Sequence, residues 1–261
     1  RKTRGPRRAR GVGLADGKNQ RAPRATGPKK HGMTRLLASV KSLPEARLAL
    51  ACGADIIDLK DPEAGALGAL PLDTVARVVR MVDRRCTVSA TLGDLPMQPQ
   101  ILCETAVQFA ATGVDFIKVG FFCEAKDCIA ALAGKARLIA VLFADRSPDF
   151  NLLADFADAG FVGVMLDTAG KTNGGLRCQM NAAALHEFVQ RAQALGLVTG
   201  LAGSLRLEDI PALIKLGPDY LGFRGALCAG TERNGGLDTS RVSALRNAIP
   251  CLSAETIRAA S

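Results

Sequence analysis

Short apolar runs alternate with amphipathic stretches along most of the chain. Eight such runs are rich in Val, Ile, Leu and Ala, and each has the length and composition of a buried strand. They are Arg35–Val40, Asp55–Lys60, Thr87–Leu92, Phe116–Phe121, Leu138–Ala144, Val162–Asp167, Val198–Ala202 and Tyr220–Arg224.

Helical spacing of apolar residues fills the intervals between these runs. One predicted buried face consists of Leu72, Val75, Val79 and Val82, and another of Leu185, Phe188, Val189, Ala192 and Leu195, with Asn181 placed as a cap. A glycine stands at the end of several helical stretches, just before the next strand, which is a common helix stop. These are Gly53, Gly113, Gly160, Gly196 and Gly217.

Eight strand–helix units without room for a second domain predict a single (β/α)8 TIM barrel over residues 33–261. A doubly wound open sheet is the alternative. It would usually carry a glycine-rich turn after the first strand, and the segment Ser39–Ser42 is not one.

The net charge of +9 comes from the first 32 residues. Residues 1–32 hold 11 of the 34 Lys and Arg side chains but one acidic residue, Asp16, so the rest of the chain is nearly neutral. This segment has no hydrophobic periodicity, and we expect it to be a disordered basic leader or tail. We favour Met33 as the natural start, with an Arg-rich presequence or an RNA-binding arm as alternatives.

The composition also narrows the function classes. A nearly neutral body argues against nucleic-acid binding by the barrel, and the absence of a run of about 18 apolar residues argues against a membrane span. Eight scattered cysteines without a CxxC motif, and two histidines, predict no metal site and a reducing cytoplasmic location. A homo-oligomer is compatible with the sequence.

Charged residues occur at the ends of three predicted strands. Alternation places Asp58 and Lys60 on the opposite face from Ile57 and Leu59, and therefore in the mouth of the barrel. By the same reasoning Lys118 and Asp167 point inward. Lys171 follows in the loop above. Because these strands are the second, fourth and sixth, their side chains could share one layer.

One inward lysine would suggest an edge strand or a side chain that reaches solvent. Two inward lysines on separate strands, with two inward aspartates, are harder to explain in this way, because buried charges cost several kcal/mol unless they are paired. The sequence therefore favours a catalytic cluster. Clustered lysines suit Schiff-base chemistry, because a neighbouring cation favours the uncharged, nucleophilic amine.

Glycine-rich segments follow the seventh and eighth strands, where this fold usually binds phosphate. The predicted phosphate-binding residues are Gly203, Ser204, Arg224, Gly225 and Ala226. The alternative is that the glycines merely turn the chain.

Several segments together resemble one known family. They are 54–62 (ADIIDLKDP), 88–94 (VSATLGD), 116–120 (FIKVG), 165–171 (MLDTAGK), 201–204 (LAGS) and 222–228 (GFRGALC). In this order they resemble the (5-formylfuran-3-yl)methyl phosphate synthases of methanofuran biosynthesis, over Met33 to about Arg246. The Ala-, Arg- and Leu-rich composition fits a methylotrophic bacterial source.

The resemblance implies a lyase that condenses two glyceraldehyde 3-phosphate molecules with loss of phosphate and water. It implies Lys60 as the Schiff-base lysine, with Asp58, Lys118, Asp167 and Lys171 as supporting acid–base groups, and no metal or organic cofactor. The loop 173–176 departs from the more charged loop expected in archaeal members. The alternatives are another lysine-dependent sugar-phosphate aldolase and an RNA-binding protein that works through its tail.

Overall fold

The computed structural model describes residues 33–122, 126–170 and 174–250. The predicted basic tail and Lys171 lie outside these ranges. The eight strands are β1 (Arg35–Val40), β2 (Ile56–Leu59), β3 (Thr87–Thr91), β4 (Phe116–Phe121), β5 (Leu138–Phe143), β6 (Gly163–Asp167), β7 (Val198–Leu201) and β8 (Tyr220–Phe223). Each predicted strand is confirmed to within one residue at either end.

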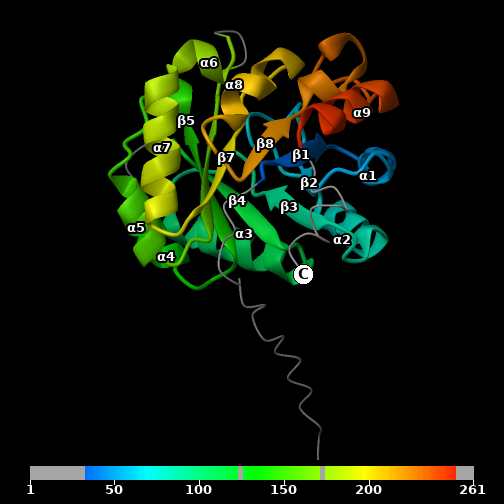
Figure 1. Ribbon diagram of the computed structural model, residues 1–261. Coiled ribbons are helices and arrows are strands. Elements are labelled where there is room, and N and C mark those ends of the chain that lie inside the picture. Colours follow the sequence, from blue (N-terminus) through cyan, green and yellow to red (C-terminus); the bar gives the residue numbers. More distant parts are fainter. Residues whose placement is uncertain (1–32, 123–125, 171–173, 251–261) are drawn as a thin grey trace, which may run out of the picture. The chain divides into compact units, whose positions relative to one another are not determined.

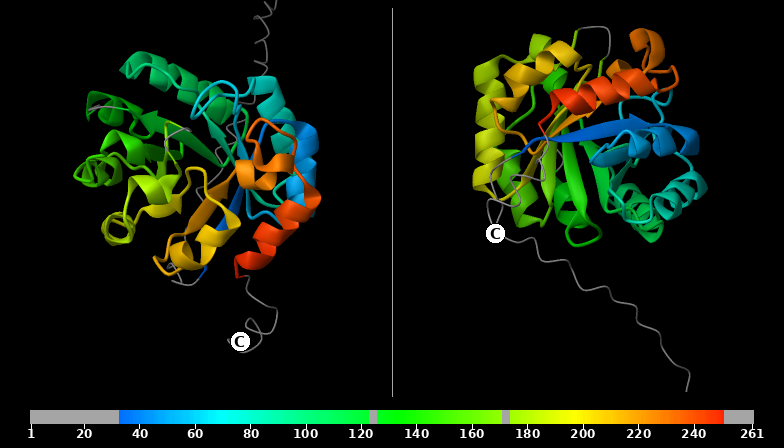
Figure 2. Two further views of the ribbon diagram at one scale, coloured as in Figure 1. Left: turned by 90° about the horizontal axis from the view of Figure 1, so that it is seen from above. Right: turned by 45° about the vertical axis from the view of Figure 1, so that its right-hand side comes forward.

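The strands close into a parallel barrel in sequence order, with β8 hydrogen-bonded to β1. Helices surround the strands (Figure 1; left view of Figure 2). They are α1 (Leu43–Ala51), α2 (Leu72–Val82), α3 (Pro99–Ala111), α4 (Lys126–Leu132), α5 (Leu152–Asp158), α6 (Leu176–Gln179), α7 (Ala182–Ala194), α8 (Ile210–Ile214) and α9 (Thr239–Ala248). Short 3₁₀ helices are η1 (Ala144–Arg146), η2 (Leu207–Asp209), η3 (Gly225–Leu227) and η4 (Ala229–Thr231). The predicted TIM barrel is therefore confirmed.

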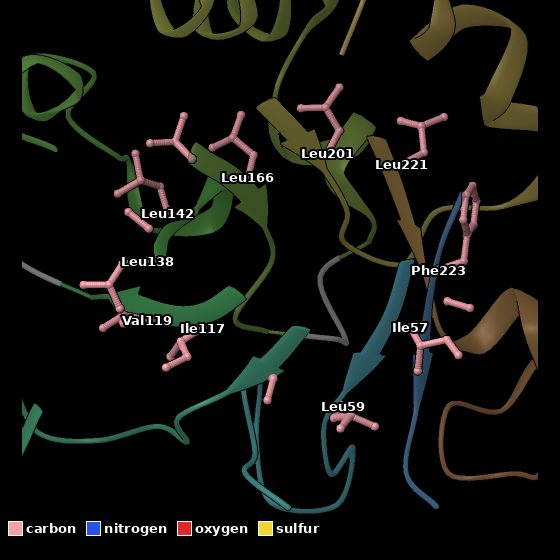
Figure 3. Packing of buried hydrophobic residues seen from close by; sticks show 14 of the residues in the cluster. Ile57, Leu59, Ile117, Val119, Leu138, Leu142, Leu166, Leu201, Leu221 and Phe223 are labelled. Atoms are coloured by element: carbon pink, nitrogen blue, oxygen red, sulfur yellow. The ribbon is translucent and has the colours of Figure 1, made fainter. Parts of the chain in front are cut away.

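Strand alternation divides the apolar side chains into two layers. Outward residues such as Ile57, Val119 and Leu166 belong to the core between strands and helices, and Figure 3 shows them around the ring of strands. Inward residues such as Ile56 and Met165 fill the barrel itself. The division follows the predicted faces, and it leaves Asp58, Lys60, Lys118 and Asp167 to point inward.

The barrel floor depends on a glycine. Gly200 on β7 is the register partner of Tyr220 on β8, and a Cβ on Gly200 would lie 2.2 Å from the Tyr220 ring. The ring therefore occupies the space above the bare backbone, where its side chain is fully buried.

The helix ends follow the predicted signals, whereas two residues of the predicted buried faces are exposed. Asn181 caps α7 by accepting a hydrogen bond from the backbone N–H of Ala184 at 2.9 Å, and all five predicted stop glycines have positive φ. Leu72 and Leu195, however, are exposed and not buried as predicted. Each lies at a helix end, where the helix leaves the barrel surface. No helix among the described residues is long and apolar enough to span a membrane.

Candidate active site

A cavity of about 980 Å³ opens at the carboxyl ends of the strands. Lys60, Lys118 and Asp167 line it, together with residues that follow β7 and β8. This is the end of the barrel at which TIM-barrel enzymes place their catalytic groups, and the volume lies at the upper end of the usual range for small-molecule sites.

Asp58 and Lys118 form a short ion pair in this mouth. The Lys118 Nζ lies 2.6 Å from Oδ1 of Asp58, and both side chains are buried. The hydroxyls of Ser39 and Ser89 donate to the same carboxylate at 3.0 and 2.7 Å. These serines are the register partners of Asp58 on β1 and β3, so the strand pairing itself builds the cluster. Both Asp58 oxygens thus have partners within the protein.

Burial shifts the protonation equilibrium of this lysine. Loss of solvent lowers the pKa of the Lys118 ammonium below its ordinary value, and the positive charge of Lys60 lowers it further, whereas the Asp58 carboxylate opposes the shift. Lys118 is therefore a cation whose proton is less firmly held than that of a surface lysine.

Lys60 and Asp167 form a second, looser pair. The Nζ of Lys60 lies 3.7 Å from Oδ2 of Asp167 and 3.5 Å from the carbonyl oxygen of Ala66. The other Asp167 oxygen accepts the backbone N–H of Thr168 at 2.7 Å, which fixes the orientation of the carboxylate. A buried amine with long contacts at the edge of a cavity can turn toward a ligand without breaking a short hydrogen bond.

The loop after β2 is fixed by a carboxylate from the loop after β3. Asp94 accepts the backbone N–H groups of Ala66 and Leu67 at 2.8 and 2.9 Å. Gly65 makes this close approach practicable, because it has φ = +109° and a Cβ there would lie 2.0 Å from Oδ2 of Asp94. This contact positions the Ala66 carbonyl beside Lys60.

A matching contact fixes the loop after β6. Asp145 in η1 accepts the backbone N–H groups of Ala169 and Gly170 at 2.8 and 2.6 Å. These residues directly precede Lys171, which lies outside the described residues.

Four residues in the turns after β7 and β8 line the cavity. Gly203, Ser204, Gly225 and Ala226 belong to its wall, and their N–H groups have no hydrogen-bond acceptor among the described residues. Gly203 and Ser204 have positive φ values of 108° and 49°, so this turn is tight. Unpaired N–H groups in the wall of one cavity suit an anionic ligand.

Arg224 does not share this free donor capacity. Its Nε donates to the carbonyl of Arg233, its Nη1 to Ser39 and Glu45, and its Nη2 to Glu45 and Gly235. All five N–H groups are thereby engaged. The predicted phosphate contact of Arg224 remains a prediction, and it would require one of these bonds to break.

Several residues that shape the site are not among those predicted from the sequence. They are Ser39, Ser89, Asp94, Asp145 and Arg233. Ser39 and Ser89 could have been found from alternation, since both point inward beside Asp58. Within residues 33–122, 126–170 and 174–250, no three His, Cys, Asp or Glu side chains are grouped to hold a metal.

Solved structures with the same architecture include crystal structures of 3-hexulose-6-phosphate synthase and of phosphoribosyl anthranilate isomerase from Thermus thermophilus. Both superpose with a TM-score of 0.62, at 18% and 15% sequence identity. The superpositions cover 83% and 82% of this chain, and 100% and 98% of those chains. At this identity the similarity shows the fold alone.

Closer relatives agree on one family. A Methanocaldococcus jannaschii protein named (5-formylfuran-3-yl)methyl phosphate synthase is 36% identical, over 81% of this chain and 97% of that protein. A Methylorubrum extorquens protein given the same name provisionally is 48% identical, over 80% of this chain and 89% of that one. The profile of the 4-HFC-P synthase family matches residues 36–246. The chain whose strand ends bring Asp58, Lys60, Lys118 and Asp167 together therefore belongs to the 4-HFC-P synthase family.

Proposed function

We propose that this enzyme condenses two molecules of glyceraldehyde 3-phosphate through an imine on Lys60. The product is (5-formylfuran-3-yl)methyl phosphate, formed in the biosynthesis of a methanofuran-type cofactor. The observation that carries the proposal is the Lys60 amine, loosely paired with Asp167 at the edge of the cavity, in a chain of this family. The atoms balance when two trioses lose one phosphate and two water molecules.

Lys60 begins the reaction by adding to the substrate carbonyl, and water leaves as the imine forms. The resulting iminium makes the adjacent C–H more acidic, so that an enamine can attack the second aldehyde. Asp167 is positioned to accept or return this proton, because its Oδ2 lies 3.7 Å from Nζ of Lys60.

Lys118 assists the departure of the phosphate in this proposal. Its ammonium is held by Asp58 while burial lowers its pKa, so it can supply positive charge or a proton as the phosphate departs. Lys171, in the segment that follows the Asp145-fixed loop, would share proton transfer or phosphate departure. Because the iminium serves as the electron sink, the proposed reaction draws on no metal or organic cofactor.

The retained phosphate lies, in this proposal, against the turns after β7 and β8. The four backbone amides of Gly203, Ser204, Gly225 and Ala226 would donate to its oxygens. We extend the proposal to a cytoplasmic enzyme whose ligand is the triose phosphate and not a nucleic acid or a membrane.

Incubation with glyceraldehyde 3-phosphate alone tests the reaction. We expect a near-ultraviolet band from the conjugated furan aldehyde and, after borohydride reduction, a mass increment on the peptide that carries Lys60. An aldol product without that band would instead assign the protein to the sugar-phosphate aldolases. A modified peptide that carries Lys118 would contradict the role of Lys60.

The phosphate position can be tested by removing one N–H group. Ala226→Pro deletes the amide hydrogen of the second residue of η3, which donates to no described protein group, whereas Ala226→Ser keeps it. A hydrogen bond to a charged ligand is worth about 1.5–3 kcal/mol, so KM should rise by about tenfold or more in the proline variant. Equal KM values in two variants with wild-type Tm would place the phosphate elsewhere.

A further inference from the structure

The loop that follows β8 is held by two cations at three successive carbonyls. Arg224 donates to the carbonyl oxygens of Arg233 and Gly235, both at 2.7 Å, and Lys41 donates to that of Asn234 at 2.7 Å. The backbone of this segment is therefore fixed, and the side chain of Arg233 projects from a rigid support.

The Arg233 guanidinium reaches into the cavity with most of its donors unused. It lines the cavity and is half-buried. In the described part of the chain it makes one hydrogen bond, from Nη2 to the carbonyl of Gly65 at 2.9 Å. The other N–H groups have no described protein acceptor, in contrast to those of Arg224.

Two successive carbonyls connect this guanidinium to Lys60. Arg233 donates to the carbonyl of Gly65, and Nζ of Lys60 lies 3.5 Å from the carbonyl oxygen of the next residue, Ala66. Burial lowers the pKa of Arg233, and the negative charge of Asp167 is the largest opposing influence. An arginine keeps its charge despite such a shift. The cavity thus contains a fixed, partly desolvated cation close to the amine that would form the imine.

The position of the Arg233 guanidinium differs from that of the turns after β7 and β8. The barrel order around the mouth is β7, β8, β1, β2, and the guanidinium contacts Gly65 in the loop after β2, across the end of β1. An anion held here would lie on the opposite side of the β1 end from an anion held by the β7 and β8 turns.

We propose that Arg233 forms a second phosphate subsite, which binds the phosphomonoester of one of the two substrate molecules next to Lys60. This inference rests on the proposed function, since a reaction of two triose phosphates brings two dianions into one cavity. A planar guanidinium with several free N–H groups is suited to bidentate contact with phosphate oxygens. Arg233 and the four turn amides would then each hold one phosphate.

Glycerol 3-phosphate is the probe for this subsite, because it has the substrate's length and phosphate but no carbonyl and cannot form an imine. Calorimetric titration of the wild-type chain should show two molecules bound. Arg233→Gln should weaken one of the two sites by about tenfold to a hundredfold and leave the other unchanged. Arg233→Lys, which keeps the charge but not the fork, should give an intermediate affinity.

Arg206→Gln is the matched control. It removes a positive charge from the wall of the same cavity, but from an exposed arginine 3.7 Å from Glu208. Its two affinities should stay within about twofold of wild type. Parallel titration with inorganic phosphate should show weaker binding at the Arg233 site, whereas the reverse preference would assign that site to released phosphate and overturn the proposal.

Fewer than two molecules bound to the wild-type chain, or two unchanged sites in a folded Arg233→Gln variant, would also overturn the subsite. Neither result depends on imine formation. A wild-type chain that makes no furan but binds two molecules of glycerol 3-phosphate would refute the proposed function alone. A chain that makes the furan but binds with unchanged affinity after loss of Arg233 would refute the subsite alone.

Discussion

The Nζ of Lys118 lies 2.6 Å from Oδ1 of Asp58, and two serine hydroxyls also donate to this carboxylate. In the other ion pair of the cluster, the Nζ of Lys60 lies 3.7 Å from Oδ2 of Asp167. The first pair has the geometry of a fixed ion pair that a buried charge requires. The second leaves the amine with long contacts at the cavity edge. The difference indicates that one lysine is held as a charge and the other is left available to react.

Lys60→Arg tests whether Lys60 is the lysine that reacts, and we expect it to have the largest effect. Arginine keeps the positive charge but stays protonated near neutral pH and cannot form an imine, so turnover should fall by at least about a thousandfold. Steady-state furan formation measures this loss. Lys126→Arg, at an exposed lysine on α4 outside the cavity, should retain wild-type kcat. A Lys60→Arg variant within tenfold of wild type would remove the Schiff-base assignment.

Asp58→Asn and Asp167→Asn compare how much each ion pair contributes to the free energy of unfolding. Loss of the Asp58 charge strands the buried Lys118 ammonium, and the free energy of unfolding should fall by about 3–5 kcal/mol. Loss of the Asp167 charge affects a longer contact beside the cavity, and the decrease should be smaller, about 2 kcal/mol.

Urea unfolding of the two variants at neutral pH gives both values. Equal decreases would mean that the two pairs are held equally firmly, whatever their distances suggest.

Lys118→Met tests the lowered pKa of Lys118 through the pH dependence of stability. Between the folded pKa and the ordinary value of 10.5, the unfolded chain binds more protons at this position than the folded chain does. The contribution of Lys118 to the free energy of unfolding therefore rises with pH through this window. We expect the free energy of unfolding of the wild type, minus that of Lys118→Met, to increase steadily as pH approaches about 10.5.

A difference that stays flat over this range would show that burial does not depress the pKa of Lys118.

Ser89→Ala should have the smallest effect of the five changes. It deletes one hydroxyl donor to Asp58, at 2.7 Å, and leaves Ser39 and Lys118 in place. The free energy of unfolding should fall by about 1 kcal/mol, with kcat reduced less than in Asp58→Asn. If kcat falls as far as in Asp58→Asn, the serine does more than hold the carboxylate.

Alternation and helix stops were sufficient to predict the barrel and the inward cluster, because both depend on local periodicity. The four described cluster residues each follow from the face of a single strand. Leu72 and Leu195 show the limit of the same reasoning, since periodicity assigns a face but not the point at which a helix leaves the core.

The different contacts of Arg224 and Arg233 could not be predicted from periodicity. They lie nine positions apart in and beside a loop without periodicity, and their sequence context gives no reason to distinguish them. What separates them is contact with remote residues, Glu45 for Arg224 and Gly65 for Arg233, and such pairings follow from barrel closure. By its contacts Arg224 is held within the protein at all its donors, and its predicted phosphate contact remains a prediction.

The bond between Arg224 and Glu45 also sets an order of assembly during synthesis. The two residues are 179 positions apart, so at about 5–20 residues per second the carboxylate would wait about 9–36 s for its arginine. Through that interval β1 also lacks its β8 neighbour. The mouth of the barrel would therefore be completed near the end of translation, after the strands that carry its lysines have left the ribosome.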